Sequence, residues 1–91
     1  MNAATLPKRL RQSIFWLNKP DHFAALPDWL AARGQFDTIL RVTHDDTGAV
    51  SFWLFLEKKR RGIVRCLTPD LADAAEEFLP FTPTDHIEGA P

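Results

Sequence analysis

Basic and aromatic residues near the middle of the chain have the side chains best suited to binding another molecule. Residues 58–61 form an unbroken run of four cations, and the apolar stretch before them carries two aromatic rings. Cations attract carboxylates and phosphates, and interfaces are enriched in aromatic residues and arginine. The predicted binding residues are Arg41, Trp53, Phe55, Lys58, Lys59, Arg60, Arg61 and Arg65.

The histidines and the one cysteine lack the spacing of a metal or nucleophile site. Zinc sites need three or four ligands, usually in close pairs such as Cys-x-x-Cys. Here the candidate ligands are spread along the chain at His22, His44, Cys66 and His86. We expect Cys66 to be a small buried hydrophobe, because no His-plus-acid set is expected to converge on it. The sequence therefore predicts no metal, no cofactor and no enzymatic activity.

The tetrapeptide Asp46-Thr47-Gly48-Ala49 resembles the active-site sequence of retroviral-type aspartic proteases. The resemblance covers four residues. That family also has an apolar pair followed by Gly and a polar residue in a later strand, which this sequence lacks. Asp-Thr-Gly is also what a type I turn with a glycine bulge requires. We therefore predict a hairpin turn at this position.

Length and composition indicate one globular domain spanning residues 1–91. A hydrophobic content of 45% with ten aromatic residues argues against disorder. The single cysteine excludes an intramolecular disulfide and fits a reducing compartment. The longest apolar run, residues 49–56, is far shorter than the roughly 20 residues that cross a bilayer, and the first residues do not form a signal peptide. We predict a cytoplasmic protein without membrane contact.

Charge is divided unevenly along the chain. Residues 1–66 hold all eleven Lys and Arg against six acids, a net of +5, and residues 67–91 hold six acids and no Lys or Arg. Such a division indicates either pairing between the acidic and basic parts or separate surfaces for partners. We expect the acidic last helix to lie against the basic run at residues 58–61 or to face water.

Two helical segments are predicted before the strands. The first covers residues 7–18, where one stripe at helical spacing is apolar: Leu6, Leu10, Ile14 and Leu17. Lys19-Pro20 ends it, because the residue before a proline disfavours helical geometry. The second begins at Asp21, which is a good N-cap, and ends at Arg33-Gly34, where glycine allows a left-handed cap.

Three antiparallel strands follow, and their turns predict a register. Asp46-Thr47-Gly48 fits a three-residue loop that pairs Asp45 with Ala49. Residues at facing positions then form apolar pairs, Val42 with Phe52 and Leu40 with Leu54. Arg60-Arg61-Gly62 fits the same loop type and places Cys66 beside Leu56.

In this register one face of the sheet is the core and the second is amphipathic. The second face brings Arg41 beside Trp53, within reach of a cation–π contact, with Phe55, Arg65 and Leu67 nearby. A shift of one residue in either loop would exchange the faces.

The last helix begins after Thr68, which is its N-cap, and Pro69 occupies its first turn. Its apolar stripe is Leu71, Ala74, Ala75, Phe78 and Leu79, and Pro80 ends it. The predicted fold is α+β, with N-terminal helices, a three-stranded antiparallel meander and a C-terminal amphipathic helix, in the order α-α-β-β-β-α. Residues 1–5 and 80–91 are predicted to be flexible tails.

Two functions fit these residues. The favoured one is a small protein-interaction or regulatory module, in which the second face binds a protein partner or a second copy and residues 58–61 steer an acidic partner. The alternative is nucleic-acid binding, since cations bind phosphate and rings stack on bases. The order helix, three strands, helix is similar to the double-stranded RNA-binding domain. That family has a lysine-rich start to its last helix, where this sequence has the acidic stretch at residues 68–73.

Overall fold

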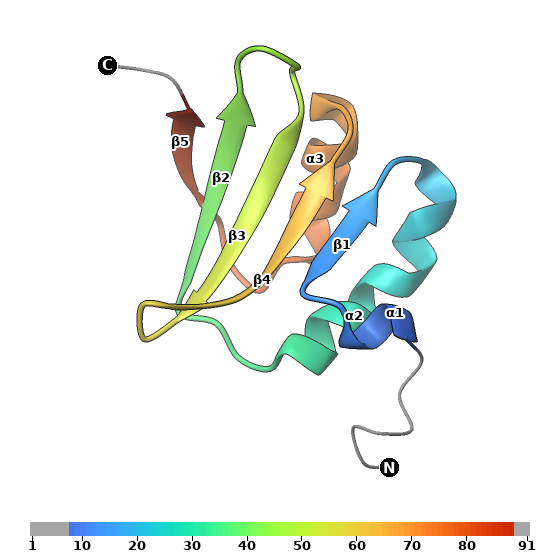
Figure 1. Ribbon diagram of the computed structural model, residues 1–91, viewed down its shortest axis with the longest axis vertical. Coiled ribbons are helices and arrows are strands. Elements are labelled where there is room, and N and C mark those ends of the chain that lie inside the picture. Colours follow the sequence, from blue (N-terminus) through green and yellow to red (C-terminus); the bar gives the residue numbers. More distant parts are fainter. Residues whose placement is uncertain (1–7, 89–91) are drawn as a thin grey trace.

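A five-stranded mixed sheet is the centre of the molecule, with its helices gathered behind it (Figure 1). The computed structural model describes the backbone of residues 8–88 and the side chains of residues 10–85. The strand order is β1-β4-β3-β2-β5. In chain order the elements are α1 (Lys8–Arg11), β1 (Ile14–Leu17), the 3-10 helix η2 (Pro20–Ala25), α2 (Leu26–Arg33), β2 (Thr38–His44), β3 (Val50–Leu56), β4 (Lys59–Cys66), α3 (Pro69–Ala75), the 3-10 helix η3 (Glu76–Phe78) and β5 (Thr84–Glu88).

The predicted three-stranded meander was wrong, because it is only the middle of this sheet. Strands β2, β3 and β4 are antiparallel, and each side of that unit gains a parallel edge strand: β1 beside β4, and β5 beside β2. Only the α+β class, taken loosely, remains of the predicted architecture. No helix within residues 8–88 combines the length and the apolar character needed to span a membrane.

The first predicted helix, residues 7–18, is helical only in its first part, and its second part is a strand. Helix α1 ends at Arg11, and β1 begins at Ile14. Within β1, Phe15 and Leu17 are buried while Trp16 is 48% exposed, which is the two-residue alternation of a strand at a sheet surface. β-branched and aromatic residues favour a pleated, half-buried surface, and this preference prevails over the helical spacing of the leucines.

The β2–β3 register differs from the predicted one by one residue. His44 pairs with Ala49 instead of Asp45, through a bond of 2.9 Å from His44 N to Ala49 O. The loop therefore has four residues, and Gly48 takes a φ of 75° at its end. Because side chains alternate along a strand, this shift turns β2 over. Arg41 now lies opposite Phe52, on the helix-covered face, and not beside Trp53.

The β3–β4 turn is also in a different place. Leu56 pairs with Lys59, so Glu57 and Lys58 are the turn, and both have the positive φ that a two-residue type I′ hairpin requires. Arg61 is the extra residue of a bulge between the pairs Leu54–Gly62 and Phe55–Arg60. The predicted loop at residues 60–62 was wrong.

The C-terminal part begins as predicted and ends differently. The Thr68 hydroxyl accepts a hydrogen bond of 3.3 Å from Leu71 N, so Thr68 is the N-cap of α3. After η3 the chain forms β5, which pairs with β2 inside the segment predicted to be a flexible tail. The other predicted tail, residues 1–5, lies outside the described residues.

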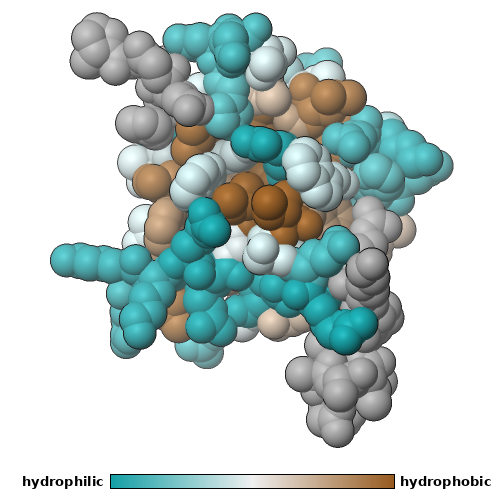
Figure 2. Space-filling view, viewed as in Figure 1, coloured by the Kyte–Doolittle hydropathy of each residue, from teal (hydrophilic) through white to brown (hydrophobic). Residues whose placement is uncertain are grey.

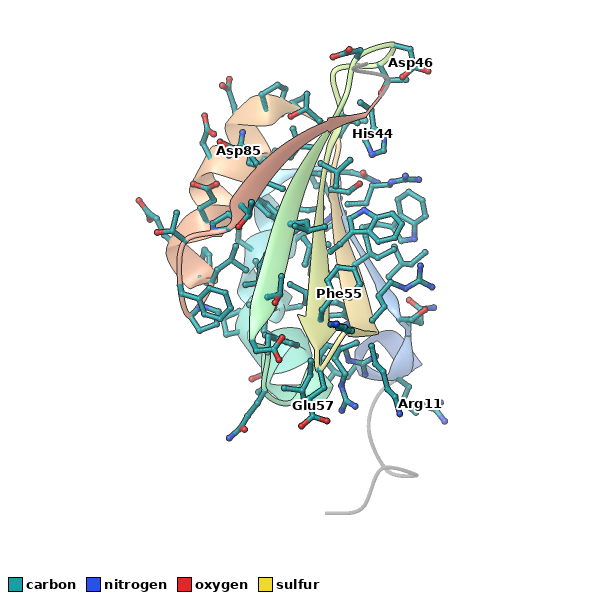
Figure 3. All side chains as sticks on the ribbon, turned by 90° about the vertical axis from the view of Figure 1, so that its left-hand side faces the viewer. Arg11, His44, Asp46, Phe55, Glu57 and Asp85 are labelled. Atoms are coloured by element: carbon teal, nitrogen blue, oxygen red, sulfur yellow. The ribbon has the colours of Figure 1, made fainter. Side chains whose placement is uncertain are left out.

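The hydrophobic core lies between the sheet and the two longer helices. Trp29 of α2 and Ala72 of α3 are fully buried, and so are Phe52 and Leu17 on the strands they cover. The Trp29 indole packs at 5.6 Å from the Phe15 ring and donates a hydrogen bond of 2.9 Å to the Gln12 carbonyl. Because α2 and α3 pack on the same face, they leave the opposite face of the sheet open, as the edge-on view shows (Figure 3).

Candidate functional site

The open face is built from aligned rows of side chains across neighbouring strands. Where strands pair in register, partner residues point to the same side of the sheet. One row is Trp16, Arg65, Ser51 and Val42, and the next is Ile14, Ile63, Trp53 and Leu40. A third row holds Arg60, Phe55 and Thr38. We call these eleven residues the open face.

Aromatic rings and arginines dominate the contacts on the open face. The Trp53 and Phe55 rings are stacked, with centroids 6.5 Å apart and an interplanar angle of 22°. The Arg60 guanidinium lies 5.4 Å from the centroid of the Trp53 ring, and the Arg65 guanidinium lies 5.6 Å from that of Trp16. Each cation–π contact at an exposed site contributes about 0.5–1 kcal/mol and limits the motion of the arginine. The arginines are therefore held in place while their charge stays accessible.

Apolar side chains occupy the middle of this face and hydrophilic ones surround them (Figure 2). Trp16 is half exposed, whereas Trp53 and Phe55 are partly buried by their neighbours. The Trp53 indole Nε1 is buried and has no hydrogen-bond acceptor among the described residues. A buried donor without an acceptor is unfavourable, and because this N–H is not accessible at the surface, a ligand could supply an acceptor only after a neighbouring side chain moved.

A polar group in the first row joins three strands. The Ser51 hydroxyl is fully buried and lies 3.1 Å from His44 Nε2. Arg65 Nε donates to the same oxygen at 3.4 Å. These contacts orient Arg65 on the open face, and the hydroxyl group of Ser51 is in contact with both His44 and Arg65.

A hollow of about 460 Å³ lies at the lower end of the open face. Leu40 and Phe55 form apolar walls, and Asp37, Glu57 and Lys58 supply charges, with Thr38 also lining it. In the edge-on view Phe55 lies on the side away from α3 and Glu57 lies below it (Figure 3). Both turn residues beside this hollow, Glu57 and Lys58, have positive φ (52° and 68°) although neither is glycine or asparagine. Such strain is found where particular side chains are needed at a site.

The basic run at residues 58–61 is divided by the structure. Lys58 is in the turn, Lys59 begins β4 and is exposed, and Arg60 joins the open face. Arg61, the bulge residue, reaches α2 and donates Nε and Nη2 to the Arg33 carbonyl at 3.3 and 3.2 Å. The acidic helix does not neutralise this run: both ion pairs found among the described residues belong to another arginine.

That arginine is Arg41, which the sequence placed on the binding surface. Its guanidinium instead lies on the covered face, 2.9 Å from Asp73 Oδ1 and 2.9 Å from Glu76 Oε1, and 5.8 Å from the Phe52 ring centroid. Burial acts to lower the pKa of Arg41, but the hydrogen bonds to Glu76 and Asp73 outweigh it and the pKa is raised. Arg41 therefore anchors α3 and η3 to the sheet and is not part of the open face.

Six open-face residues were missed by the sequence reasoning. Ile14 and Trp16 were assigned to a helix, Thr38, Leu40 and Val42 to the core face, and Ile63 was not considered. The signal for Trp16 was available: Ile14 to Leu17 is a run of β-branched, aromatic and leucine residues before the turn signal at Lys19-Pro20. Of the eight predicted residues, the structure brings four together on the open face: Trp53, Phe55, Arg60 and Arg65. Lys58 and Lys59 lie at its lower margin, whereas Arg61 and Arg41 turn toward the helices.

Comparisons with known proteins do not indicate a family or a function for this chain. The chain has no significant match to any protein-family model, curated protein or solved structure. Among the described residues, no group of three or more His, Cys, Asp and Glu side chains could hold a metal ion. Burial raises the pKa of the Cys66 thiol to about 12, so this thiol is un-ionised at neutral pH.

Proposed function

We propose that this domain is a small non-enzymatic interaction module whose open face binds an acidic protein segment bearing apolar side chains. One observation supports this most directly: the stacked Trp53 and Phe55 lie on the face that α2 and α3 leave open, beside arginines that form no ion pair among the described residues. Aromatic and arginine anchors of this kind supply most of the energy of protein interfaces.

The chemistry of the partner follows from charge. Arg60 and Arg65 are on the open face, and Lys58 and Lys59 are at its margin, while Arg61 contacts α2 and the acids of α3 and η3 lie behind the sheet. A partner with carboxylates is therefore attracted to the open face. A second copy that packed its open face on this one would bring like charges together, which disfavours the predicted homodimer.

The hollow beside Phe55 favours a protein over a nucleic acid. Two of its lining side chains, Asp37 and Glu57, are acidic and would repel a phosphate backbone, which is charged at every unit, whereas a peptide can place an apolar residue here and its carboxylates beside the arginines. Its apolar walls, Leu40 and Phe55, suit an apolar side chain. Arg60 already lies over the face of Trp53 that a base would need for stacking. A cytoplasmic location is part of the same proposal, because the single buried thiol needs no oxidising compartment.

Selection from a phage-displayed random peptide library on the immobilised full chain tests the proposal. We expect acidic peptides with one or two large apolar residues. Replacing an anchor should weaken binding by about 2 kcal/mol, so Trp16→Ser and Arg65→Gln should each lower affinity at least tenfold. Phe81→Ser is the matched control, because it removes a partly exposed ring (38%) that is not on the open face.

The rival functions give different outcomes. If a nucleic acid is the partner, a single-stranded oligonucleotide binds more tightly than any selected peptide, with an affinity that falls steeply with salt. If the partner is a second copy, sedimentation shows a wild-type dimer that Trp16→Ser converts to monomer. Either result, or peptides that bind Trp16→Ser as well as wild type, contradicts the proposal.

A further inference from the structure

Three arginines line a small pocket at the lower margin of the molecule, apart from the hollow beside Phe55. Arg33 and Ala32 come from the end of α2, and Arg60 and Arg61 come from the beginning of β4. The pocket has a volume of about 220 Å³. Pockets for organic ligands measure about 300–1,000 Å³, so this one suits a small ion or a single chemical group.

Arg33 is held in a fixed position by neutral partners. Its Nη1 donates to the Gln12 carbonyl at 2.8 Å, and its Nη2 donates to the Leu10 carbonyl. The guanidinium also lies 5.3 Å from the centroid of the Trp29 ring. Carbonyls and rings orient a guanidinium but leave its full positive charge in place.

The other two arginines are fixed in the same manner. Arg61 donates two hydrogen bonds to the Arg33 carbonyl, and Arg60 lies over the Trp53 ring. None of the three forms an ion pair with a described carboxylate. Arg33 and Arg61 therefore bring two uncompensated positive charges together, in positions set before any ligand arrives, and Arg60 lines the same pocket.

The pKa of Arg33 reflects its burial and the nearby positive charge. Burial, and then the positive charge of Arg61, lower the pKa of Arg33. In addition, Arg33 Nε is buried and has no acceptor among the described residues. A pair of like charges is unfavourable, and an anion between them would relieve the repulsion.

We propose that Arg33, Arg60 and Arg61 form a binding site for a tetrahedral oxyanion, phosphate in the first place. Guanidinium groups offer planar forks of N–H donors that match phosphate oxygens in charge and geometry. The arginines are already ordered, so little side-chain entropy is lost on binding. The site uses a pocket outside the open face and shares Arg60 with the proposed function, so Arg61→Gln is the variant that separates the two.

Titration of the ¹⁵N-labelled full chain with sodium phosphate, followed by NMR of the arginine Nε–Hε signals, tests the site. Sodium chloride at matched ionic strength is the reference. We expect saturable shifts of the Arg33 and Arg61 signals with phosphate and none with chloride. A hydrogen bond to a charged group corresponds to about a tenfold change in affinity or more, so Arg61→Gln and Arg60→Gln should each weaken binding about tenfold. Lys19→Gln, which removes an exposed cation at the opposite end of β1, should change it less than about twofold.

A second titration with O-phosphoserine identifies the source of the phosphate group. Tighter binding of O-phosphoserine than of inorganic phosphate assigns the site to a phosphorylated partner, and equal binding assigns it to the free ion. The proposal is wrong if phosphate and chloride shift the arginine signals alike. It is also wrong if both glutamine variants, shown to be folded by their amide spectra, bind phosphate as wild type does.

Discussion

Replacing Gly62 by alanine tests directly which face of β4 is covered. Gly62 pairs with Leu54, and both face the helices. A Cβ at this position would lie 2.8 Å from Trp29 Cη2 and 3.1 Å from Arg33 Cδ. Trp29 is fully buried, with its indole bonded to the Gln12 carbonyl, so the ring cannot turn aside freely.

The size of the effect follows from two opposing terms. Overpacking a filled core costs about 1–3 kcal/mol. Alanine also restricts the unfolded chain, which stabilises the folded protein by about 0.4–1 kcal/mol where the backbone permits alanine. The backbone at Gly62 permits it, because Gly62 does not have a positive φ. The net expectation is a loss of up to about 2.6 kcal/mol in the free energy of unfolding. If residue 62 faced solvent, only the second term would act and alanine would stabilise.

Urea unfolding followed by tryptophan fluorescence measures this free energy. The companion background is Trp29→Phe, whose smaller ring leaves room for the new methyl group. Residues in contact show a coupling energy in such a cycle, so Gly62→Ala should cost less in that background than in wild type. A stabilising Gly62→Ala, or an equal cost in both backgrounds, would refute the placement of α2 over β4.

Three further predictions concern single contacts. Arg41→Ala should lower the free energy of unfolding, measured with urea, by about 1–3 kcal/mol. Adding Glu76→Gln to that variant should lower it little further, because the partner of the ion pair is already absent. If Glu76→Gln costs as much in the variant as in wild type, the ion pair is contradicted. Because the pKa of Cys66 is raised to about 12, the unfolded thiol ionises first, so stability from this group is complete below about pH 9 and falls by up to about 1.4 kcal/mol per pH unit above it. The slope should vanish in Cys66→Ala, and an unchanged slope would exclude the thiol as its cause. Lys58→Gly should raise the melting temperature, because glycine adopts the φ of 68° without strain and gains about 0.5–1.5 kcal/mol; a lower melting temperature would contradict the turn assignment.

The sequence was informative where one physical signal acted alone. In α3 the cap and the proline in the first turn agree, and Thr68 caps the helix as predicted, although the buried face contains Ala72 and Ala75 and leaves the predicted Ala74 and Phe78 exposed. At β1 two signals competed: Leu10, Ile14 and Leu17 fit a helical stripe, while residues 14–17 also fit a strand. The competition was decided by a parallel partner, β4, which lies far away in the sequence. The local sequence pattern of residues 10–17 cannot indicate that these residues pair with β4.

Hairpin turns limited the prediction of the site. Both predicted loops followed the position of glycine, but the β3–β4 turn uses Glu57 and Lys58 in left-handed conformations that favour glycine or asparagine. The strand β3 was assigned to the correct faces, with Phe52 and Leu54 in the core and Trp53 opposite. The one-residue error in the β2–β3 loop affected only β2, and it was enough to move Arg41 from the core to the predicted binding surface.

The open face itself follows from topology once the edge strands are known. Strands β1, β4, β2 and β5 run in the same direction, so the connections β1 to β2 and β4 to β5 both join parallel strands of one sheet. Each connection skips two strands, and both move along the sheet in the same sense (Figure 1). Such crossovers are right-handed in nearly all proteins, which requires α2 and α3 to lie on the same face. Trp53 is therefore left uncovered by these helices because of chain handedness, and the proposed binding partner would account for the aromatic residues beside it.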